Sequence, residues 1–157
     1  MKLGLPINVR KLDHGLQLLE ELDFHSCQLN CGYQNLTKEH AEQVAARLKE
    51  AGLTVSSVWP SYPVEGRMQW RYSRESSPSV GLVPPETRAE RMECFKKASD
   101  FAAWLGCPNL AQHVGYVPED PADPIYAGFV EDMGDLIDHC RRNDGQYFLF
   151  ETGQETP

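Results

Sequence analysis

The sequence predicts an α/β fold built on a parallel sheet, and three observations lead to this prediction. Short apolar runs alternate strictly with amphipathic segments of helical spacing, in the order β-α-β-α-β-α-β-α-β. A length of 157 residues suits one domain with its own core. The composition, 41% hydrophobic and 24% charged, is that of a soluble globular chain. This alternation implies parallel strands joined by right-handed crossovers. Two architectures have such connections, a doubly wound open sheet and a (β/α)8 barrel.

The first half of the chain contains three predicted strands and two predicted helices. Asp13 is expected to cap a helix whose leucines, from Leu12 to Leu22, recur at helical spacing. Thr37 caps a second helix, and Gly52 stands where a helix C-terminus favours a left-handed residue. The three strands are Leu3–Val9, Phe24–Asn30 and Leu53–Trp59.

The second half contains two further helices and two strands. A long helix covers residues 86–105, with an apolar inner face. Its outer face is expected to carry the charged side chains Arg88, Glu90, Arg91, Lys96 and Lys97. Asn109–Val114 is the fourth strand, and Asp123 followed by Pro124 opens the last helix. The final run, QYFLFE from Gln146, is typical of a buried strand that ends in a carboxylate.

A segment of about 25 residues between Pro60 and Pro85 shows no regular pattern. Loops of this length within a compact domain are usually functional or disordered. This one holds Tyr62, Trp70 and Tyr72 among three arginines, which is an unusual aromatic content for a linker. Two interpretations stay open: a lid over a substrate, and a segment that packs locally or contacts a partner chain.

Charge, cysteine content and missing motifs exclude several classes of function. The net charge of −8 and the sequence pI near 5.1 argue against a nucleic-acid surface. Five cysteines without a regular framework indicate buried free thiols in a reducing compartment. The N-terminus lacks a secretory h-region and no apolar run is long enough to span a membrane, so we expect a cytoplasmic protein. Neither GxGxxG nor a Walker A motif occurs, and this absence argues against a nucleotide-binding function.

In either architecture the functional site lies at the C-terminal ends of the strands. The residues that the predicted strands deliver there are Gln28, Asn30, Trp59, His113, Glu151 and, just beyond, Glu155. His113 and Glu151 should come from adjacent strands at the same height. One imidazole and one carboxylate form half of a divalent-metal or proton-transfer site. Taken singly, a strand-end histidine is more often structural, and a strand-end glutamate can simply face solvent.

Three blocks carry a resemblance to a known family: GLVPPETRAER, DFAAWLGCPNLAQHVGYVPED and FLFETGQETP. Together they resemble the sugar phosphate isomerase/epimerase group of the xylose-isomerase-like TIM barrels, a superfamily that also includes endonuclease IV-type repair enzymes. The resemblance implies a partial (β/α)8 barrel of about five strands and four helices. It further implies that residues 1–157 are one domain, equivalent to the N-terminal part of the family barrel.

The resemblance also implies a site and a reaction. Glu151 is expected as a ligand of a divalent metal (Mn, Mg, Co or Zn), with His113 and Glu155 as further catalytic residues. Trp59, Trp70 and Gln28 are expected to contact a small sugar or sugar phosphate. The implied activity is isomerisation or epimerisation by proton transfer through a metal-stabilised enediolate. Strands six to eight, which supply the remaining ligands in the family, are not represented in this sequence.

Two alternatives stay open. A metal phosphodiesterase of the endonuclease IV type would need histidines on the third strand, where this sequence has Ser56, Ser57 and Trp59. A half-barrel with two unpaired edge strands could instead be non-catalytic and associate with a second copy, so we expect a homo-oligomer.

Overall fold

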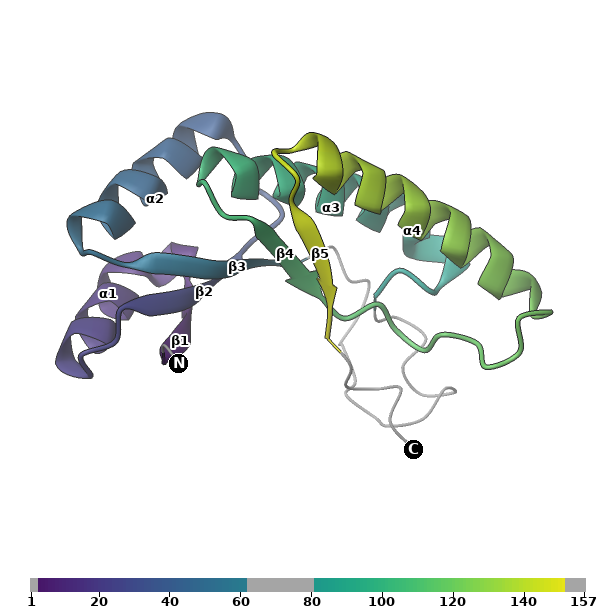
Figure 1. Ribbon diagram of the computed structural model, residues 1–157, viewed down its shortest axis with the longest axis horizontal. Helices are drawn as coiled ribbons and strands as arrows, with labels where there is room; N and C mark the ends of the chain where they lie inside the picture. The colour runs from purple at the N-terminus through teal and green to yellow at the C-terminus, as the bar shows by residue number, and fades with distance from the viewer. Residues whose placement is uncertain (1–2, 62–80, 152–157) are drawn as a thin grey trace.

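The computed structural model describes residues 3–61 and 81–151, which form one layer of parallel strands covered by helices (Figure 1). The strands are β1 (Gly4–Asn8), β2 (Ser26–Cys31), β3 (Thr54–Pro60), β4 (Asn109–Gln112) and β5 (Tyr147–Phe150). The helices are α1 (Leu12–Glu21), α2 (Lys38–Glu50), α3 (Pro85–Trp104) and α4 (Pro124–Arg142), with a short 3-10 turn at Val9–Lys11. The predicted count of five strands and four helices is confirmed.

The order of the strands decides between the two architectures that periodicity left open, and it confirms the barrel that the family resemblance implies. The five strands are all parallel and lie in the order β1-β2-β3-β4-β5. A doubly wound sheet reverses its strand order at a switch point, whereas a barrel adds each new strand beside the previous one. The described residues therefore form part of a (β/α)8 barrel, curved as Figure 1 shows.

The core lies between the sheet and the helices, because alternate strand residues point toward the helical layer. Leu29, Val58 and Leu110 from three successive strands are fully buried there. They contact a cluster of helical side chains that includes Leu19, Val44, Phe95, Phe101 and Leu136. The apolar inner face predicted for α3 is confirmed by its buried Met92, Phe95, Ala98 and Ala102.

Two of the three predicted helix caps are confirmed. The Thr37 hydroxyl accepts a hydrogen bond from the backbone N–H of His40, and the Asp123 carboxylate accepts one from Ile125. The prediction for Asp13 is wrong: α1 begins at Leu12, with Lys11 at the cap position. Asp13 lies within the first turn, where its carboxylate pairs with Arg47 of α2 at 2.6 Å.

The charged face predicted for α3 is wrong for two of its five members. Arg88 and Arg91 are buried, at 7% and 1% exposure. Their guanidinium groups donate to backbone carbonyls of the segment that precedes the helix: Arg91 to Gly81, and Arg88 to Leu82 and Val83. Arg88 also pairs with Asp132 of α4 at 3.3 Å. These arginines are buried because irregular backbone packed against the core needs donors for its carbonyl groups.

The last strand is less buried than its apolar sequence predicts. Tyr147, Leu149 and Phe150 are 67%, 42% and 54% exposed, while Phe148 packs against Phe95 with ring centroids 6.2 Å apart. β5 is an edge of the described sheet, so one side of the strand has no described neighbour. None of the helices in the described ranges is long and apolar enough to span a membrane.

Candidate functional site

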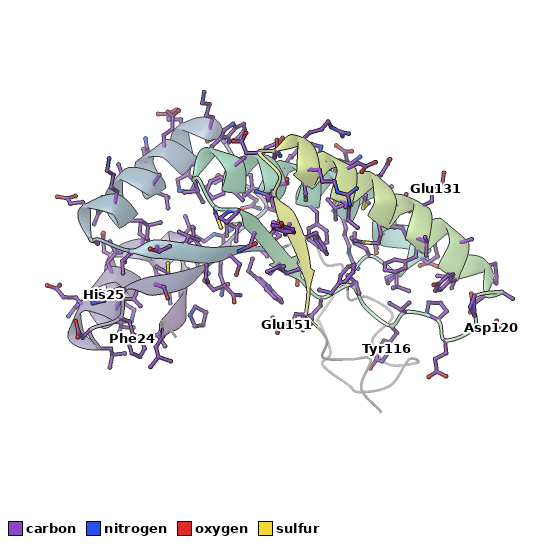
Figure 2. All side chains as sticks on the ribbon, viewed as in Figure 1. Phe24, His25, Tyr116, Asp120, Glu131 and Glu151 are labelled. Carbon is purple, nitrogen blue, oxygen red and sulfur yellow. The ribbon has the colours of Figure 1, made fainter. Side chains whose placement is uncertain are left out.

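The C-terminal ends of the strands bring four of the predicted site residues to one edge of the sheet. Asn30 and Trp59 are register partners on β2 and β3. β4 and β5 pair through Gln112 and Phe150, so His113 and Glu151 follow one residue beyond this pair. Figure 2 shows Glu151 at the end of β5.

His113 and Glu151 are in contact, which confirms that adjacent strands bring them to the same height. His113 Nδ1 lies 3.0 Å from the backbone oxygen of Glu151, and His113 Nε2 lies 3.8 Å from Glu151 Oε1. The backbone N–H of Glu151 donates to the carbonyl of Gln112 at 3.1 Å. The imidazole is 11% exposed and the carboxylate 54% exposed. A shielded imidazole thus faces a carboxylate that solvent or a ligand can reach.

The contact with the Glu151 carbonyl assigns the tautomer of His113. A carbonyl oxygen only accepts hydrogen bonds, so Nδ1 must carry the proton. In the neutral ring Nε2 then bears the lone pair, on the side of the Glu151 carboxylate. Histidines that ligate metals commonly donate their other ring N–H to a carbonyl or carboxylate in this way.

Trp59 supplies an aromatic wall beside His113. The two ring centroids lie 5.1 Å apart with an interplanar angle of 85°, an edge-to-face arrangement that aromatic quadrupoles favour. Trp59 is half-buried and stands on the face of β3 opposite to the core residue Val58. The indole therefore lies on the inner side of the sheet, together with the imidazole.

The remaining predicted residues are not brought to this contact. Gln28 lies two residues before Asn30 on β2, where its side-chain amide donates to Asn30 Oδ1 at 3.4 Å. Trp70 and Glu155 lie outside the described residues.

With the geometry established, comparison with known proteins decides the family. The family model of the xylose isomerase-like TIM barrel matches residues 13–156. This chain belongs to that family.

Three solved structures resemble the chain over nearly its whole length. A xylose isomerase domain protein from Planctomyces limnophilus is 32% identical over 99% of this chain, with a TM-score of 0.82. A putative xylose isomerase from Rhodospirillum rubrum is 18% identical over 94% of this chain, with a TM-score of 0.68. D-psicose 3-epimerase, crystallised in the presence of D-fructose, is 15% identical over 97% of this chain, with a TM-score of 0.61.

The chain spans only about half the length of these solved structures. It covers 55%, 53% and 52% of the three structures, in the same order. Among curated proteins none matches the chain. The two matches below 25% identity carry information on the fold alone.

The site was only partly visible in the sequence, because its supporting residue Gln112 was missed. Gln112 is buried, and its side-chain amide contacts both the Pro60 carbonyl and the His113 backbone N–H. Alternation places it with Leu110 on the side that faces the helices, so no sequence signal marks it as part of a site. Within residues 3–61 and 81–151, no group of three or more His, Cys, Asp or Glu side chains could hold a metal ion.

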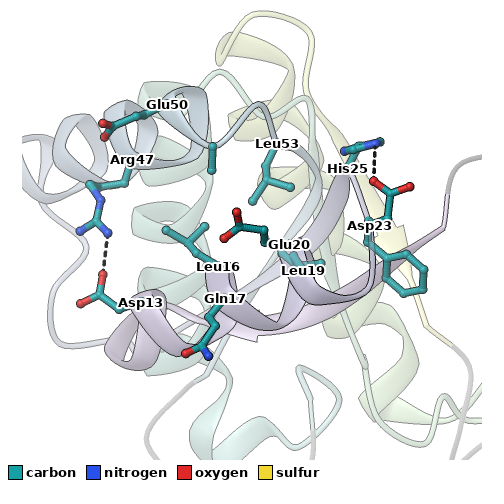
Figure 3. A pocket seen from close by; sticks show the side chains of 12 residues that line it. Asp13, Leu16, Gln17, Leu19, Glu20, Asp23, His25, Arg47, Glu50 and Leu53 are labelled. Carbon is teal, nitrogen blue, oxygen red and sulfur yellow. Dashed lines mark hydrogen bonds and ion pairs between the residues drawn. The ribbon is translucent and has the colours of Figure 1, made fainter.

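A hollow of about 620 Å³ lies between α1 and α2, at the ends of the strands opposite to the candidate site (Figure 3). Leu16 and Leu53 contribute apolar surface, and the ion pair between Asp13 and Arg47 lies at its rim. It holds none of the predicted site residues. In TIM barrels the catalytic residues come from the C-terminal ends of the strands, whereas the opposite face serves stability.

Proposed function

We propose that this chain is the N-terminal part of a divalent-metal-dependent isomerase or epimerase that acts on a sugar or sugar phosphate. The supporting observation is the contact between His113 and Glu151 at the C-terminal ends of adjacent barrel strands. Family membership adds to it, because the chain resembles epimerases and isomerases of sugars in fold.

The donor set fits a divalent cation. A carboxylate oxygen suits Mg and Mn, and an imidazole nitrogen suits Zn and similar transition metals, so this pair of donors does not choose among Mn, Mg, Co and Zn. In this proposal Glu151 is a metal ligand and Nε2 of His113 a second donor, with its tautomer held by the Glu151 carbonyl. When bound, such a cation polarises a carbonyl oxygen and stabilises the charge that develops on it. The described residues contribute these two donors only, so the proposal needs further ligands from water, substrate or other residues.

Each side chain of the site would then have a separate role in a proton transfer. The half-exposed Glu151 carboxylate would take the proton from the carbon next to a sugar carbonyl and return it, on the same face, to the neighbouring carbon. Return of a proton to the other face needs a second, opposing carboxylate. The Trp59 ring covers one side and limits the access of water. Gln28 offers an amide to a sugar hydroxyl if it exchanges its contact with Asn30.

Five further parts of the proposal rest on sequence expectations. Glu155 is a second catalytic carboxylate, and Trp70 contacts the substrate. The 157 residues act as one domain. The protein is cytoplasmic, in keeping with its five free thiols, and it forms a homo-oligomer through its open strands.

Metal-dependent melting tests the proposal. A ligand that binds only the folded state adds about 2.7 kcal/mol at one hundred times its dissociation constant. We expect excess MnCl2 to raise the melting temperature of the wild type relative to EDTA, and Glu151→Gln to abolish this increase. Glu131→Gln is the matched control, because Glu131 is exposed on α4, away from the strand ends (Figure 2).

Two outcomes would contradict the proposal. The first is an equal manganese effect in Glu151→Gln and the wild type, since Glu151 would then not be a ligand. The second is the absence of any carbon-bound deuterium when the manganese-loaded protein is incubated with a panel of ketoses and aldoses in D2O and followed by NMR. Deuterium uptake next to the carbonyl reports proton abstraction even where no net isomerisation accumulates.

A further inference from the structure

The amide of Gln112 bridges two strands at the site. Its Oε1 accepts a hydrogen bond from the His113 backbone N–H at 2.8 Å, and its Nε2 donates to the Pro60 carbonyl. An N–H partner demands the oxygen and a carbonyl partner demands the nitrogen, so these two contacts assign the orientation of the amide. Gln112 is 3% exposed, and both the oxygen and the nitrogen of its amide form hydrogen bonds.

This bridge lies where the sheet is weakly paired. β2 and β3 share six register pairs, whereas β3 and β4 share one among the described residues, Val58 opposite Leu110. Side-chain amides connect β3 and β4 at both ends of this seam, the boundary between the two strands. Asn109 donates to the Ser56 carbonyl at 2.8 Å, and Gln112 donates to the Pro60 carbonyl. At the C-terminal end, the Gln112 side chain thus supplies a hydrogen bond between β3 and β4 beyond the single register pair.

Gln112 and its partner Pro60 are direct sequence neighbours of the two residues whose aromatic rings meet at the site. Pro60 follows Trp59, and Gln112 precedes His113 and also holds its backbone N–H. The edge-to-face contact of the two rings, at 5.1 Å, joins the same two strands on the inner side of the sheet. On the far side of the imidazole, the Glu151 carbonyl binds Nδ1. Moving β4 away from β3 would thus change the direction in which His113 Nε2 points.

We infer that Gln112 is a positioning residue for the proposed metal site. Its amide sets the separation of β3 and β4. That separation in turn sets the orientation of the His113 ring toward the Glu151 carboxylate and the tautomer of the ring. The inference rests on the proposed function for the role of the site, and on the hydrogen bonds alone for the geometry. Outer-shell partners of metal ligands typically contribute about tenfold to hundredfold to metal affinity.

Histidine side-chain NMR tests the geometric part without metal or activity. In the wild type we expect the long-range ¹H–¹⁵N correlations of a His113 ring that carries a proton on Nδ1, and we assign them by their loss in His113→Asn. Gln112→Met keeps the volume but removes both hydrogen bonds, whereas Gln112→Glu keeps the acceptor for the His113 N–H and replaces the donor to Pro60 with a carboxyl oxygen. In both variants we expect the His113 signals to shift or to show a mixture of tautomers.

Asn109→Asp is the matched control, because it removes the amide donor at the other end of the same seam without contacting His113. It should leave the His113 signals unchanged. The manganese dissociation constant should rise about tenfold to hundredfold in the Gln112 variants and less than about twofold in Asn109→Asp.

The outcomes separate this inference from the proposed function. Wild-type His113 protonated at Nε2, or unchanged His113 signals in a folded Gln112 variant, would overturn the positioning role. If manganese binding depends on Glu151 but not on Gln112, the proposed function stands and the positioning role fails. If the tautomer depends on Gln112 but the wild type binds no manganese, the positioning role stands and the metal-dependent function fails.

Discussion

At the scale of single residues, the buried thiols give the protein a pH-dependent stability. Burial raises the pKa of Cys27 from its ordinary value of 9.0 to about 11, with Cys107 adding to the effect, and burial raises the pKa of Cys31 to about 12. All five cysteines are free, and four of them are buried. The sequence-based interpretation of these residues as small core hydrophobes is thus confirmed for four of five.

The sign of the pH effect follows from these shifts. Above pH 9.0 the unfolded chain releases thiol protons that the folded chain still binds. We therefore expect the free energy of unfolding to fall as the pH rises from about 9 to about 11, measured by chemical denaturation at a series of pH values. The double variant Cys27→Ala/Cys31→Ala should show a shallower slope. An identical slope in both proteins would show that these thiols are not the cause.

At the scale of elements, the segment that leads into α3 is fastened next to the candidate site. The backbone N–H groups of Leu82 and Val83 both donate to the Val114 carbonyl, at 2.7 and 3.0 Å, just after His113 on the chain. Arg88 and Arg91 hold the carbonyls of the same segment from the helix side. The long segment whose lid role the sequence left open thus enters α3 beside the site, although residues 62–80 lie outside the described part.

Gly81 makes this docking possible. It adopts φ +74°, and a Cβ there would lie 2.0 Å from the Val114 carbonyl carbon. Gly81→Ala combines a left-handed backbone with overlap against main-chain atoms, so we expect a loss of about 2–4 kcal/mol by urea denaturation. Gly52→Ala is the control, since Gly52 has φ +67° but no atom within 4 Å. It should cost about 1–2 kcal/mol, from the backbone conformation alone. Equal losses in both variants would refute tight docking at Val114.

At the scale of the whole molecule, the described sheet has two open edges, β1 and β5. The β5 edge exposes Tyr147, Leu149 and Phe150 beside backbone groups that can pair with another strand. Exposed apolar edge strands favour association, because pairing satisfies the backbone and buries the side chains. The net charge of −8 opposes this association, so its strength should increase with salt.

We expect the isolated chain to self-associate in sedimentation velocity, with a sedimentation coefficient that rises with concentration. Leu149→Lys should weaken the association by placing a charge on the edge. Val130→Lys is the matched control, because Val130 is 48% exposed on α4 rather than on β5. A monomer at every concentration, with cooperative unfolding, would contradict this prediction.

The sequence by itself determined the alternation of strands and helices, the caps at Thr37 and Asp123, and the delivery of His113 and Glu151 to strand ends. These features depend on periodicity and on neighbours within a few residues. The meeting of the two residues was also predictable, because parallel strands end at the same edge of a sheet.

Only the tertiary structure decided the rest. The strand order, a long-range property, confirmed the barrel that the family resemblance implied and that the strand and helix periodicity had left open. The tertiary structure buried Arg88 and Arg91 and left Leu149 and Phe150 exposed, against their local patterns. The Gln112 bridge spans 52 residues of sequence. The physical reason is common to all: a side chain is buried or exposed according to which distant backbone groups lie beside it, and local sequence does not carry that information.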